Sequence, residues 1–192
     1  AYNAAATLPR ALASVFAQTC LPAEIVVVDD ASLDRTWDAL QEVCETHREQ
    51  SVRAVRLERN GGAASARNAG WALASQGFVA FLDADDAWHP RKLELQYRWM
   101  TEHPQVVLCG HRCEVAGDPG AVAELPARDI PARRFGLTSF LVANRLSTPT
   151  VMVRRELGER FAEQKRYSED YLLWMQIVAR HGPAGFIELP LA

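Results

Sequence analysis

The chain has 192 residues, of which 48% are hydrophobic and 23% are charged, so its apolar content is sufficient for one globular domain with a substantial core. Its 21 basic and 24 acidic side chains give a formal charge of −3, which provides no overall attraction to nucleic acid or to an anionic membrane. No apolar run reaches the roughly 18 residues that a membrane-spanning helix needs, and no signal peptide opens the chain. These features predict a cytoplasmic protein.

Over about the first 100 residues, helical patterns alternate with apolar strands. The β-branched run at 25–28 and the apolar run at 78–82 lack polar alternation, which is typical of parallel strands covered on both faces. In chain order we expect helices at 8–16, 34–49 and 64–75, and strands at 24–28, 52–57 and 78–82. This order predicts an α/β domain with a mostly parallel sheet.

The second half is less regular. We expect a helix at 90–102, a strand at 106–109, a loop rich in Pro, Gly and Ala at 117–134, a strand at 148–153 and a helix at 168–180. No linker or internal repeat divides the chain, so residues 1–192 are predicted to form a single domain. Both ends nevertheless have the pattern of a cut chain, because the first residue is Ala1 rather than Met and the last residues, 188–192, stop without capping or turn chemistry.

The four cysteines are expected to be reduced, since a domain of this size needs no disulfides. Cys109, His111 and Cys113 do not predict a zinc site, because alternate residues of a strand share one face and the Cys-x2-Cys spacing is missing.

Acidic residues follow both apolar strands, at the sheet edge where ligands bind in open parallel sheets. Asp29 and Asp30 follow the first strand, and Asp83, Asp85 and Asp86 follow the second. An Asp-x-Asp motif suits a hard divalent cation such as Mg²⁺ or Mn²⁺, which also binds substrate phosphates. The alternative is a set of solvated turn aspartates.

A Gly61-Gly62 turn opens the helix that contains Arg67, and such a turn can direct backbone N–H groups and a guanidinium toward phosphate oxygens. Neither a Gly-x-Gly-x-x-Gly nor a Gly-Lys-Ser/Thr fingerprint is present. The turn therefore remains a candidate for phosphate binding, but it belongs neither to the dinucleotide-binding motif nor to the P-loop.

Five ordered motifs resemble those of the family 2 glycosyltransferases. They are Ala1-Tyr2-Asn3, Ile25–Asp34, Asn60–Gly70, Phe81–Pro90 and Ser168–Trp174. The resemblance implies a GT-A fold, a Rossmann-like α/β architecture with a nucleotide-sugar-binding half at about 1–100 and an acceptor-binding half at about 101–192. It also implies transfer of a sugar, with inversion, from a nucleotide-diphosphate donor to a saccharide, lipid-linked or other hydroxyl acceptor in cell envelope polysaccharide synthesis, with peripheral membrane association for a lipid-linked acceptor.

The resemblance also assigns donor-binding residues. Tyr2 and Asp30 match positions that contact uracil, which favours a UDP-sugar donor. Asn60 and Arg67 belong to the motif near the nucleotide and its diphosphate, and Asp83 matches the aspartate near the ribose.

The resemblance assigns metal binding and proton abstraction to two further carboxylates. Asp85 matches the residue that holds Mg²⁺ or Mn²⁺, and Asp170 matches the catalytic base. Ser168 is a candidate N-cap, which would place Asp170 in the first turn of a helix. The alternative for Asp170 is a partner of the helix dipole, because acidic residues are favoured at that position in any helix.

One departure concerns the start of the chain. In the family an apolar strand precedes the motif that contains Tyr2 and lies inside the sheet, and this sequence lacks that strand. Its absence would expose two apolar strand edges, so we expect the natural chain to contain a further strand ahead of Ala1.

Two other functions share these features. A sugar-phosphate nucleotidyltransferase would have a Gly-rich loop with Arg or Lys where this chain has Tyr2–Ala6, and a catalytically silent nucleotide-sugar-binding module is supported only by the short ends. Among the aromatic residues, Trp99 and Trp174 are predicted to lie in the core, whereas Trp88 is the candidate for stacking on a sugar.

Overall fold

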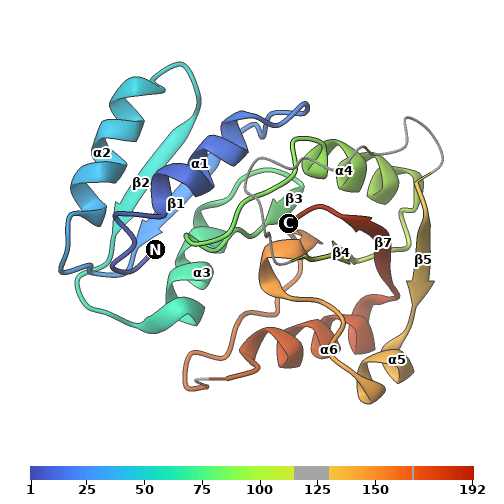
Figure 1. The fold of residues 1–192 in the computed structure, drawn as a ribbon. Coiled ribbons are helices and arrows are strands. Elements are labelled where there is room, and N and C mark those ends of the chain that lie inside the picture. The colour runs from blue at the N-terminus through green and yellow to red at the C-terminus, as the bar shows by residue number, and fades with distance from the viewer. Residues whose placement is uncertain (115–129, 166) are drawn as a thin grey trace.

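The computed structural model describes residues 1–114, 130–165 and 167–192. No helix among these residues combines the length and the apolar character needed to cross a membrane. In chain order the elements are α1 (Leu8–Phe16), β1 (Ile25–Asp29), α2 (Thr36–Thr46), β2 (Val52–Arg56), α3 (Gly62–Leu73), β3 (Phe78–Ala80), α4 (Lys92–Glu102), β4 (Leu108–Arg112), β5 (Ala132–Phe135), α5 (Leu137–Val142), the 3₁₀ helix η1 (Thr148–Thr150), β6 (Met152–Arg154), α6 (Glu169–His181) and β7 (Ala184–Pro190) (Figure 1).

The strands form two sheets. β1 pairs in parallel with β2, from Ile25 opposite Val52 to Asp29 opposite Arg56. The larger sheet has the order β3-β6-β4-β7-β5, in which β4 and β7 are parallel. β6 runs antiparallel to both β3 and β4, and β5 runs antiparallel to β7. The α/β prediction is confirmed, and the larger sheet is mixed because the late strand β6 lies between two earlier ones.

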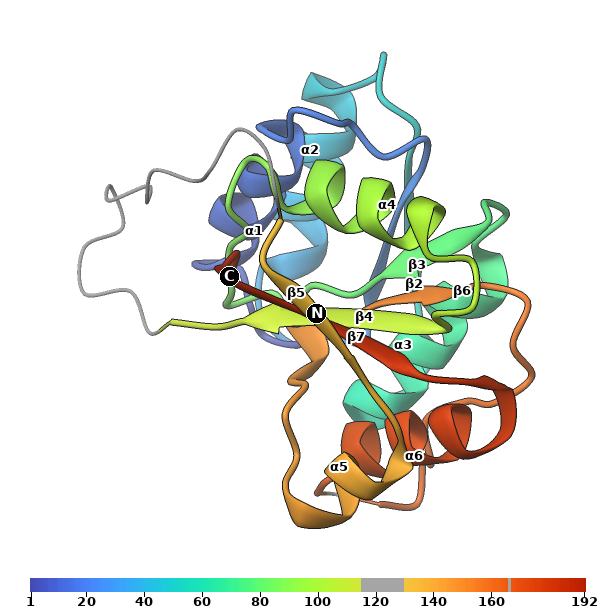
Figure 2. The same ribbon diagram turned by 90° about the vertical axis from the view of Figure 1, so that its right-hand side faces the viewer.

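Helices cover both faces of the larger sheet. α4 lies on one face, and α5 and α6 lie on the other (Figure 2). Trp99 of α4 packs in one core cluster with Ile187, and Trp174 of α6 packs in another with Val153. Both tryptophans are buried, so their predicted core positions are confirmed.

A cavity of about 690 Å³ lies between the two sheets. β1 and β3 line it together with residues of α1 and α3, and within the described part of the chain each of these two strands has only one neighbouring strand. Ile25, Val26 and all of β3 are consequently only half-buried. The open side is an edge of each strand and not a face. The faces of β3 pack against two different core clusters, Val79 in one and Phe78 in the other, and β1 contacts α3 and packs through Val27 with Leu12 of α1, as expected for strands covered on both faces.

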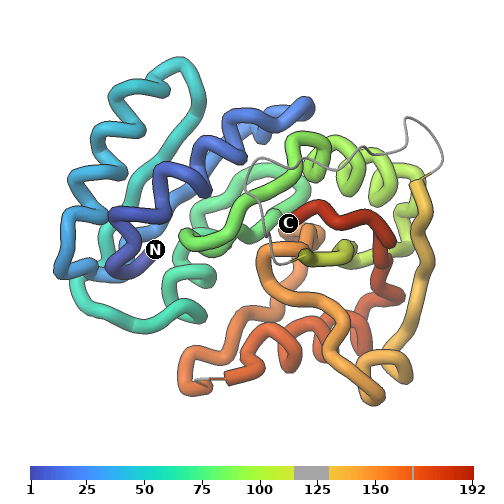
Figure 3. The backbone as a smooth tube through the Cα atoms, in the orientation of Figure 1, coloured from blue at the N-terminus to red at the C-terminus, as the bar shows by residue number. Residues whose placement is uncertain are grey.

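The chain begins beside the end of β1 (Figure 3). The Ala1 amine donates to the Val28 carbonyl oxygen at 2.7 Å, and the Asp30 amide donates to the Ala1 carbonyl oxygen at 2.8 Å. These two bonds have the pattern of parallel strand pairing. Ala1 is therefore paired with β1, next to the cavity.

The second half differs most from the expected elements. β5, α5 and β7 were not expected, and residues 117–129 of the expected loop lie outside the described residues. The expected strand at 148–153 begins instead as η1, and β6 starts only at Met152. Pro149 favours this change, because its fixed φ suits a helical turn and it has no N–H to donate to a neighbouring strand.

Candidate active site

Asp30 holds the N-terminus of α3. Its Oδ1 accepts a hydrogen bond from the Gly61 amide at 2.8 Å, and its Oδ2 accepts one from the Gly62 amide at 2.7 Å. Gly62 has a φ of +84°, which favours glycine and explains why the turn carries this residue. The Asp30 side chain is only 2% exposed, and each carboxylate oxygen keeps a further lone pair.

Tyr2 lies on a loop that is tied to the residues after β1. Asn3 Oδ1 accepts a hydrogen bond from the Leu33 amide at 2.9 Å, and the Ala4 amide donates to Thr36 Oγ1 at 2.7 Å. The Tyr2 side chain is 45% exposed and is available to a ligand. The structure thus brings the Tyr2 loop next to Asp30.

Asn60 also contacts this region, since its Nδ2 donates to the Asp30 carbonyl oxygen at 3.3 Å. The side chain therefore fixes the backbone at the end of β1. The Asn60 amide is thus engaged with the protein itself, beside Asp30.

Arg67 joins the two halves of the chain. Its Nη2 donates to Asp83 Oδ1 and Oδ2 at 2.7 and 3.0 Å, and its Nη1 donates to Glu169 Oε1 at 3.0 Å. The Arg67 side chain is 15% exposed, so these charge-assisted bonds are partly shielded from water. They place the acidic turn after β3 beside the first turn of α6.

The acidic turn contains three carboxylates, and the Asp86 amide donates to the Asp83 carbonyl oxygen at 3.1 Å. Burial, and then the negative charges of Asp83 and Asp85, raise the pKa of Asp86. Asp85 is exposed, and its carboxylate has no hydrogen bond or ion pair with any residue that the structure describes. The turn therefore has an excess of negative charge and one unengaged carboxylate.

This donor set fits a divalent metal that also binds substrate. Among the described residues, no group of three or more His, Cys, Asp or Glu side chains could hold a metal ion by itself. Mg²⁺, however, is usually held by one or two carboxylates, water and substrate phosphates. The unengaged Asp85 carboxylate matches that requirement, whereas Asp83 is occupied by Arg67.

Asp170 lies in the first turn of α6. Its Oδ1 accepts a hydrogen bond from the Tyr171 amide at 2.6 Å, and its Oδ2 accepts one from Thr148 Oγ1 at 3.3 Å. Ser168 occupies the N-cap position but has a φ of 58° and makes no side-chain cap bond. The predicted capping by the Ser168 side chain is wrong, because this left-handed backbone leaves the cap bond unformed, and the acidic residues of the first turn complement the helix dipole instead.

Trp88 does not form a sugar-stacking surface. Its side chain is buried, its Nε1 donates to the Pro149 carbonyl oxygen at 2.8 Å, and Lys92 Nζ lies 3.8 Å from the ring centroid. Both the edge and a face of the indole are therefore occupied by the protein. The prediction made for this tryptophan is wrong.

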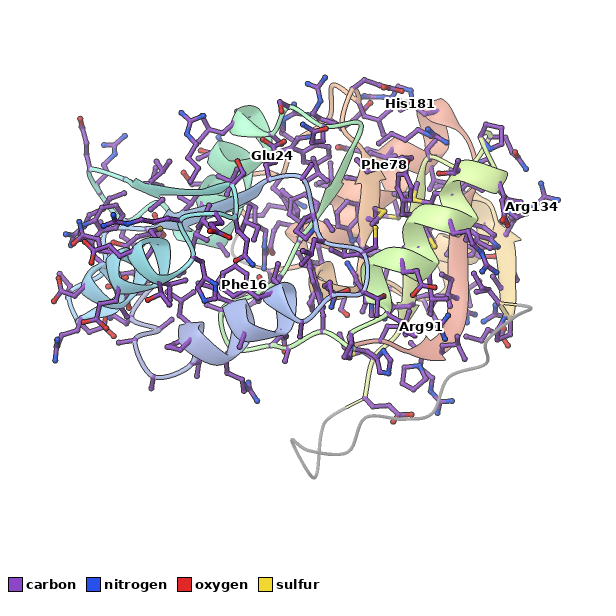
Figure 4. The ribbon with its side chains drawn as sticks, turned by 90° about the horizontal axis from the view of Figure 1, so that it is seen from above. Phe16, Glu24, Phe78, Arg91, Arg134 and His181 are labelled. Carbon is purple, nitrogen blue, oxygen red and sulfur yellow. The ribbon has the colours of Figure 1, made fainter. Side chains whose placement is uncertain are left out.

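Two residues near the site were not assigned a binding or catalytic role from the sequence, Glu169 and Thr148. Glu169 had a local signal, its place beside Asp170, whereas the contact of Thr148 with Asp170 joins distant segments. Arg134 is remote from the site, at the outer end of the molecule on β5 (Figure 4).

The chain matches the protein family described as "Glycosyl transferase family 2" over residues 1–157. It is 30% identical over 177 residues to "UDP-Glc:alpha-D-GlcNAc-diphosphoundecaprenol beta-1,3-glucosyltransferase WfgD" of Escherichia coli, a match that covers 92% of this chain and 66% of that protein. It is 32% identical over 194 residues to "Succinoglycan biosynthesis protein ExoO" of Rhizobium meliloti (strain 1021), with 95% and 55% covered. The chain thus spans between 55% and 66% of the length of these two relatives.

Solved structures share the fold. The crystal structure of S. aureus TarS 1-349 in complex with UDP-GlcNAc superposes with a TM-score of 0.80 at 26% identity, covering 99% of this chain and 55% of that chain. Mannosyltransferase PcManGT from Pyrobaculum calidifontis, in complex with GDP-Man and Mn²⁺, has a TM-score of 0.74 at 22% identity, with 99% and 52% covered, and supports the fold alone. The predicted GT-A fold is confirmed.

Proposed function

Because the chain belongs to glycosyl transferase family 2, we propose that it transfers a sugar from a nucleotide-diphosphate donor to an acceptor hydroxyl. We favour a UDP-sugar donor, since the E. coli relative is named for UDP-Glc and the TarS structure contains UDP-GlcNAc. We propose a saccharide or lipid-linked acceptor in cell envelope polysaccharide synthesis, because the same relative is named for a diphosphoundecaprenol acceptor. The reaction would then take place in the cytoplasm, at the membrane face for a lipid-linked acceptor.

One observation carries this proposal, namely the Arg67 bridge between Asp83 and Glu169. A glycosyl transfer needs charge stabilisation at the leaving diphosphate and a base at the acceptor hydroxyl. The bridge joins the segment that bears Asp85 to the helix turn that bears Asp170. This contact between distant parts of the sequence supports a single site to which Asp85 and Asp170 both belong.

The proposed reaction is a direct displacement. Asp170 accepts the proton of the acceptor hydroxyl while the acceptor oxygen forms a bond to the anomeric carbon. The bond between that carbon and the diphosphate oxygen breaks, and the nucleoside diphosphate leaves with the bonding electron pair. Attack from the face opposite the leaving group inverts the anomeric centre, and the proton remains on Asp170.

We propose that Asp85 holds Mg²⁺ or Mn²⁺ together with the donor diphosphate. The bound metal would neutralise negative charge on the leaving group. The excess negative charge of the acidic turn, seen in the raised pKa of Asp86, supports a cation at this position.

The donor nucleoside would contact the elements at the end of β1. Tyr2 and Asp30 are proposed to contact uracil, Asn60 to keep the Asp30 backbone in place, and Asp83 to lie near the ribose. A uracil ring N–H can donate to a carboxylate, whereas adenine offers an unprotonated nitrogen at the equivalent edge. The Asp30 lone pairs not used by Gly61 and Gly62 support this choice of base.

The test begins with binding. Thermal shifts are measured with UDP, GDP, dTDP and ADP, with and without Mn²⁺, because a ligand that binds only the folded state stabilises it with saturation. We expect UDP with Mn²⁺ to give the largest shift, and equal shifts with ADP would contradict the uracil contact. Release of UDP from UDP-Glc and UDP-GlcNAc by the full-length protein is then measured with lipid-extract acceptors. Release of pyrophosphate from UTP and a sugar phosphate, or donor binding without turnover, would favour the two alternative functions.

A further inference from the structure

We infer that Thr148 is a positioning residue that fixes the orientation of the Asp170 carboxylate, an inference that rests on the proposed role of Asp170 as the base. Thr148 belongs to η1, whereas Asp170 belongs to α6. The Thr148 Oγ1 donates to Asp170 Oδ2 at 3.3 Å. Catalytic hydrogen bonds are often long before substrate binds and shorten in the reacting complex.

The two oxygens of this carboxylate have different partners. Oδ1 accepts a bond from the amide of the next residue, Tyr171, and is therefore fixed from within α6. Oδ2 is held from outside the helix by the Thr148 hydroxyl. With both bonds in place, rotation of the carboxylate about its bond to Cβ is restricted, and a defined lone pair stays directed at the acceptor.

η1 is itself held rigidly. Trp88 Nε1 donates to the Pro149 carbonyl oxygen at 2.8 Å, and Gln96 Nε2 donates to the Thr150 carbonyl oxygen at 2.9 Å. Thr148 is buried, and its hydroxyl is therefore presented from a fixed backbone. Trp88 follows the acidic turn closely in sequence, so the same contacts connect the turn that bears Asp85 with the residue that orients Asp170.

A catalytic role explains why the buried Thr148 hydroxyl of η1 contacts the first turn of α6. Oriented groups lower the entropic part of a reaction barrier, and a base that rotates freely loses that advantage. Loss of the Thr148 hydroxyl should therefore reduce turnover much more than donor binding.

The test compares three variants of the full-length protein in the UDP-release assay. Thr148→Val exchanges the hydroxyl for a methyl group of similar size, and we expect kcat to fall about 10- to 100-fold, as for loss of a hydrogen bond to a charged group, with the donor KM changed less than about twofold. Thr148→Ser keeps the hydroxyl and should restore kcat to within about threefold of wild type. Thr150→Val is the matched control, because it removes a buried hydroxyl of the same turn that donates to the Ser147 carbonyl oxygen and not to Asp170.

A double-variant comparison separates positioning from general damage. In the Asp170→Asn background, Thr148→Val should cause no further loss of kcat, because the base it orients is gone. The positioning role would be overturned if the kcat losses of Thr148→Val and Asp170→Asn multiplied in the double variant, or if Thr148→Val lowered kcat no more than Thr150→Val does. Either result would leave the proposed function intact. Wild-type turnover in Asp170→Asn alone would instead overturn the base assignment, and with it this inference.

Discussion

Arg67 donates from Nη2 to both carboxylate oxygens of Asp83, and the same guanidinium reaches Glu169 from Nη1. A planar fork with five donors can bridge two carboxylates in this way, whereas a lysine ammonium is a compact point charge without that geometry. The bridge is thus specific to arginine, and it joins segments that are distant in the sequence.

Arg67→Lys is therefore expected to lower the free energy of unfolding by about 1–3 kcal/mol, because one carboxylate of the bridge loses its partner in a partly buried place. UDP release should fall as well, since the acidic turn is no longer fixed against α6. Urea unfolding and the UDP-release assay measure the two effects. Arg35→Lys is the control, because Arg35 and Asp38 form an ion pair whose side chains are 81% and 60% exposed. A change at Arg67 no larger than that at Arg35 would show that the bridge is dispensable.

Asp170 and Glu169 are adjacent but have different partners, Thr148 and Arg67. Adjacent helix residues point about 100° apart, so the two side chains cannot serve one acceptor. Asp170→Asn should lower turnover on the order of 10² to 10⁴-fold with donor binding nearly unchanged. Glu169→Gln should instead weaken the contact through which Arg67 holds the acidic turn against α6, and should thereby lower the affinity for the donor. Calorimetric UDP titrations and UDP release separate the two variants, and a reversed pattern would contradict the assignment.

Asp85→Asn is expected to weaken Mn²⁺-dependent binding of UDP about tenfold or more, which corresponds to roughly 1.4 kcal/mol. The folded state should persist, because the Asp85 carboxylate is exposed and bonds to no described residue. Calorimetry with and without Mn²⁺ measures the effect, with Asp38→Asn on α2 as an exposed control. Equal Mn²⁺-UDP affinities of the wild-type protein and Asp85→Asn would remove Asp85 from the proposed metal site.

His111 gives the fold a defined response to acid. Burial, and then the charge of Lys92, lower the pKa of the His111 ring to about 3 from its usual value of 6.5. Between these two pH values the unfolded chain binds the proton and the folded chain does not, so stability falls as the pH falls from 6.5 toward 3. Across this pH range the free energy of unfolding falls by an amount on the order of several kcal/mol.

His111→Gln removes the titrating ring, and the loss of stability between pH 7 and pH 4 should become shallower than in the wild-type protein. Urea unfolding midpoints at several pH values measure the slope. The same exchange at His47, which lies partly exposed after α2 and stacks on Phe16, provides the control. Parallel slopes for His111→Gln and the wild-type protein would exclude His111 as the acid-sensitive group.

The first half of the chain was predicted more accurately than the second, for a physical reason. The β-branched run of β1 and the Gly61-Gly62 turn before α3 are local signals, and both elements lie where these signals place them. The position of β6 between β3 and β4 depends on pairing between distant segments, which leaves no local pattern. β5 and α5 lie at or just after the end of the expected loop. Neither element has a clear periodic pattern of apolar residues, so neither was predicted.

The site shows the same division. Carboxylates at strand ends were visible in the sequence, whereas the partners that fix them were not. Arg67 was expected at a phosphate and is held between Asp83 and Glu169, and Trp88 was expected at a surface but donates to Pro149 from the interior. These contacts depend on how the two halves pack, and no spacing rule within either half encodes them.

The cavity between the sheets leads to the last prediction. β1 and β3 present apolar edges to a space of about 690 Å³, and Ala1 already forms the two backbone bonds of a parallel strand beside β1. A segment that continues backward from Ala1 in this register would run along β1 toward Ile25. We therefore propose that the cavity can accept an extended apolar segment that pairs with β1 in this register and lies between β1 and β3.

Fusion of six β-branched apolar residues ahead of Ala1 should raise the melting temperature by more than about 4 °C, because each kcal/mol gained shifts a domain of this size by roughly 2–4 °C and several apolar side chains become buried. A matched fusion with two prolines cannot donate the ladder hydrogen bonds and serves as the control. Hydrogen exchange should slow at those β1 amides that face the cavity, and only with the apolar fusion. Equal melting temperatures and equal exchange for the two fusions would show that the cavity does not accept a strand, since the added apolar surface would then remain in solvent.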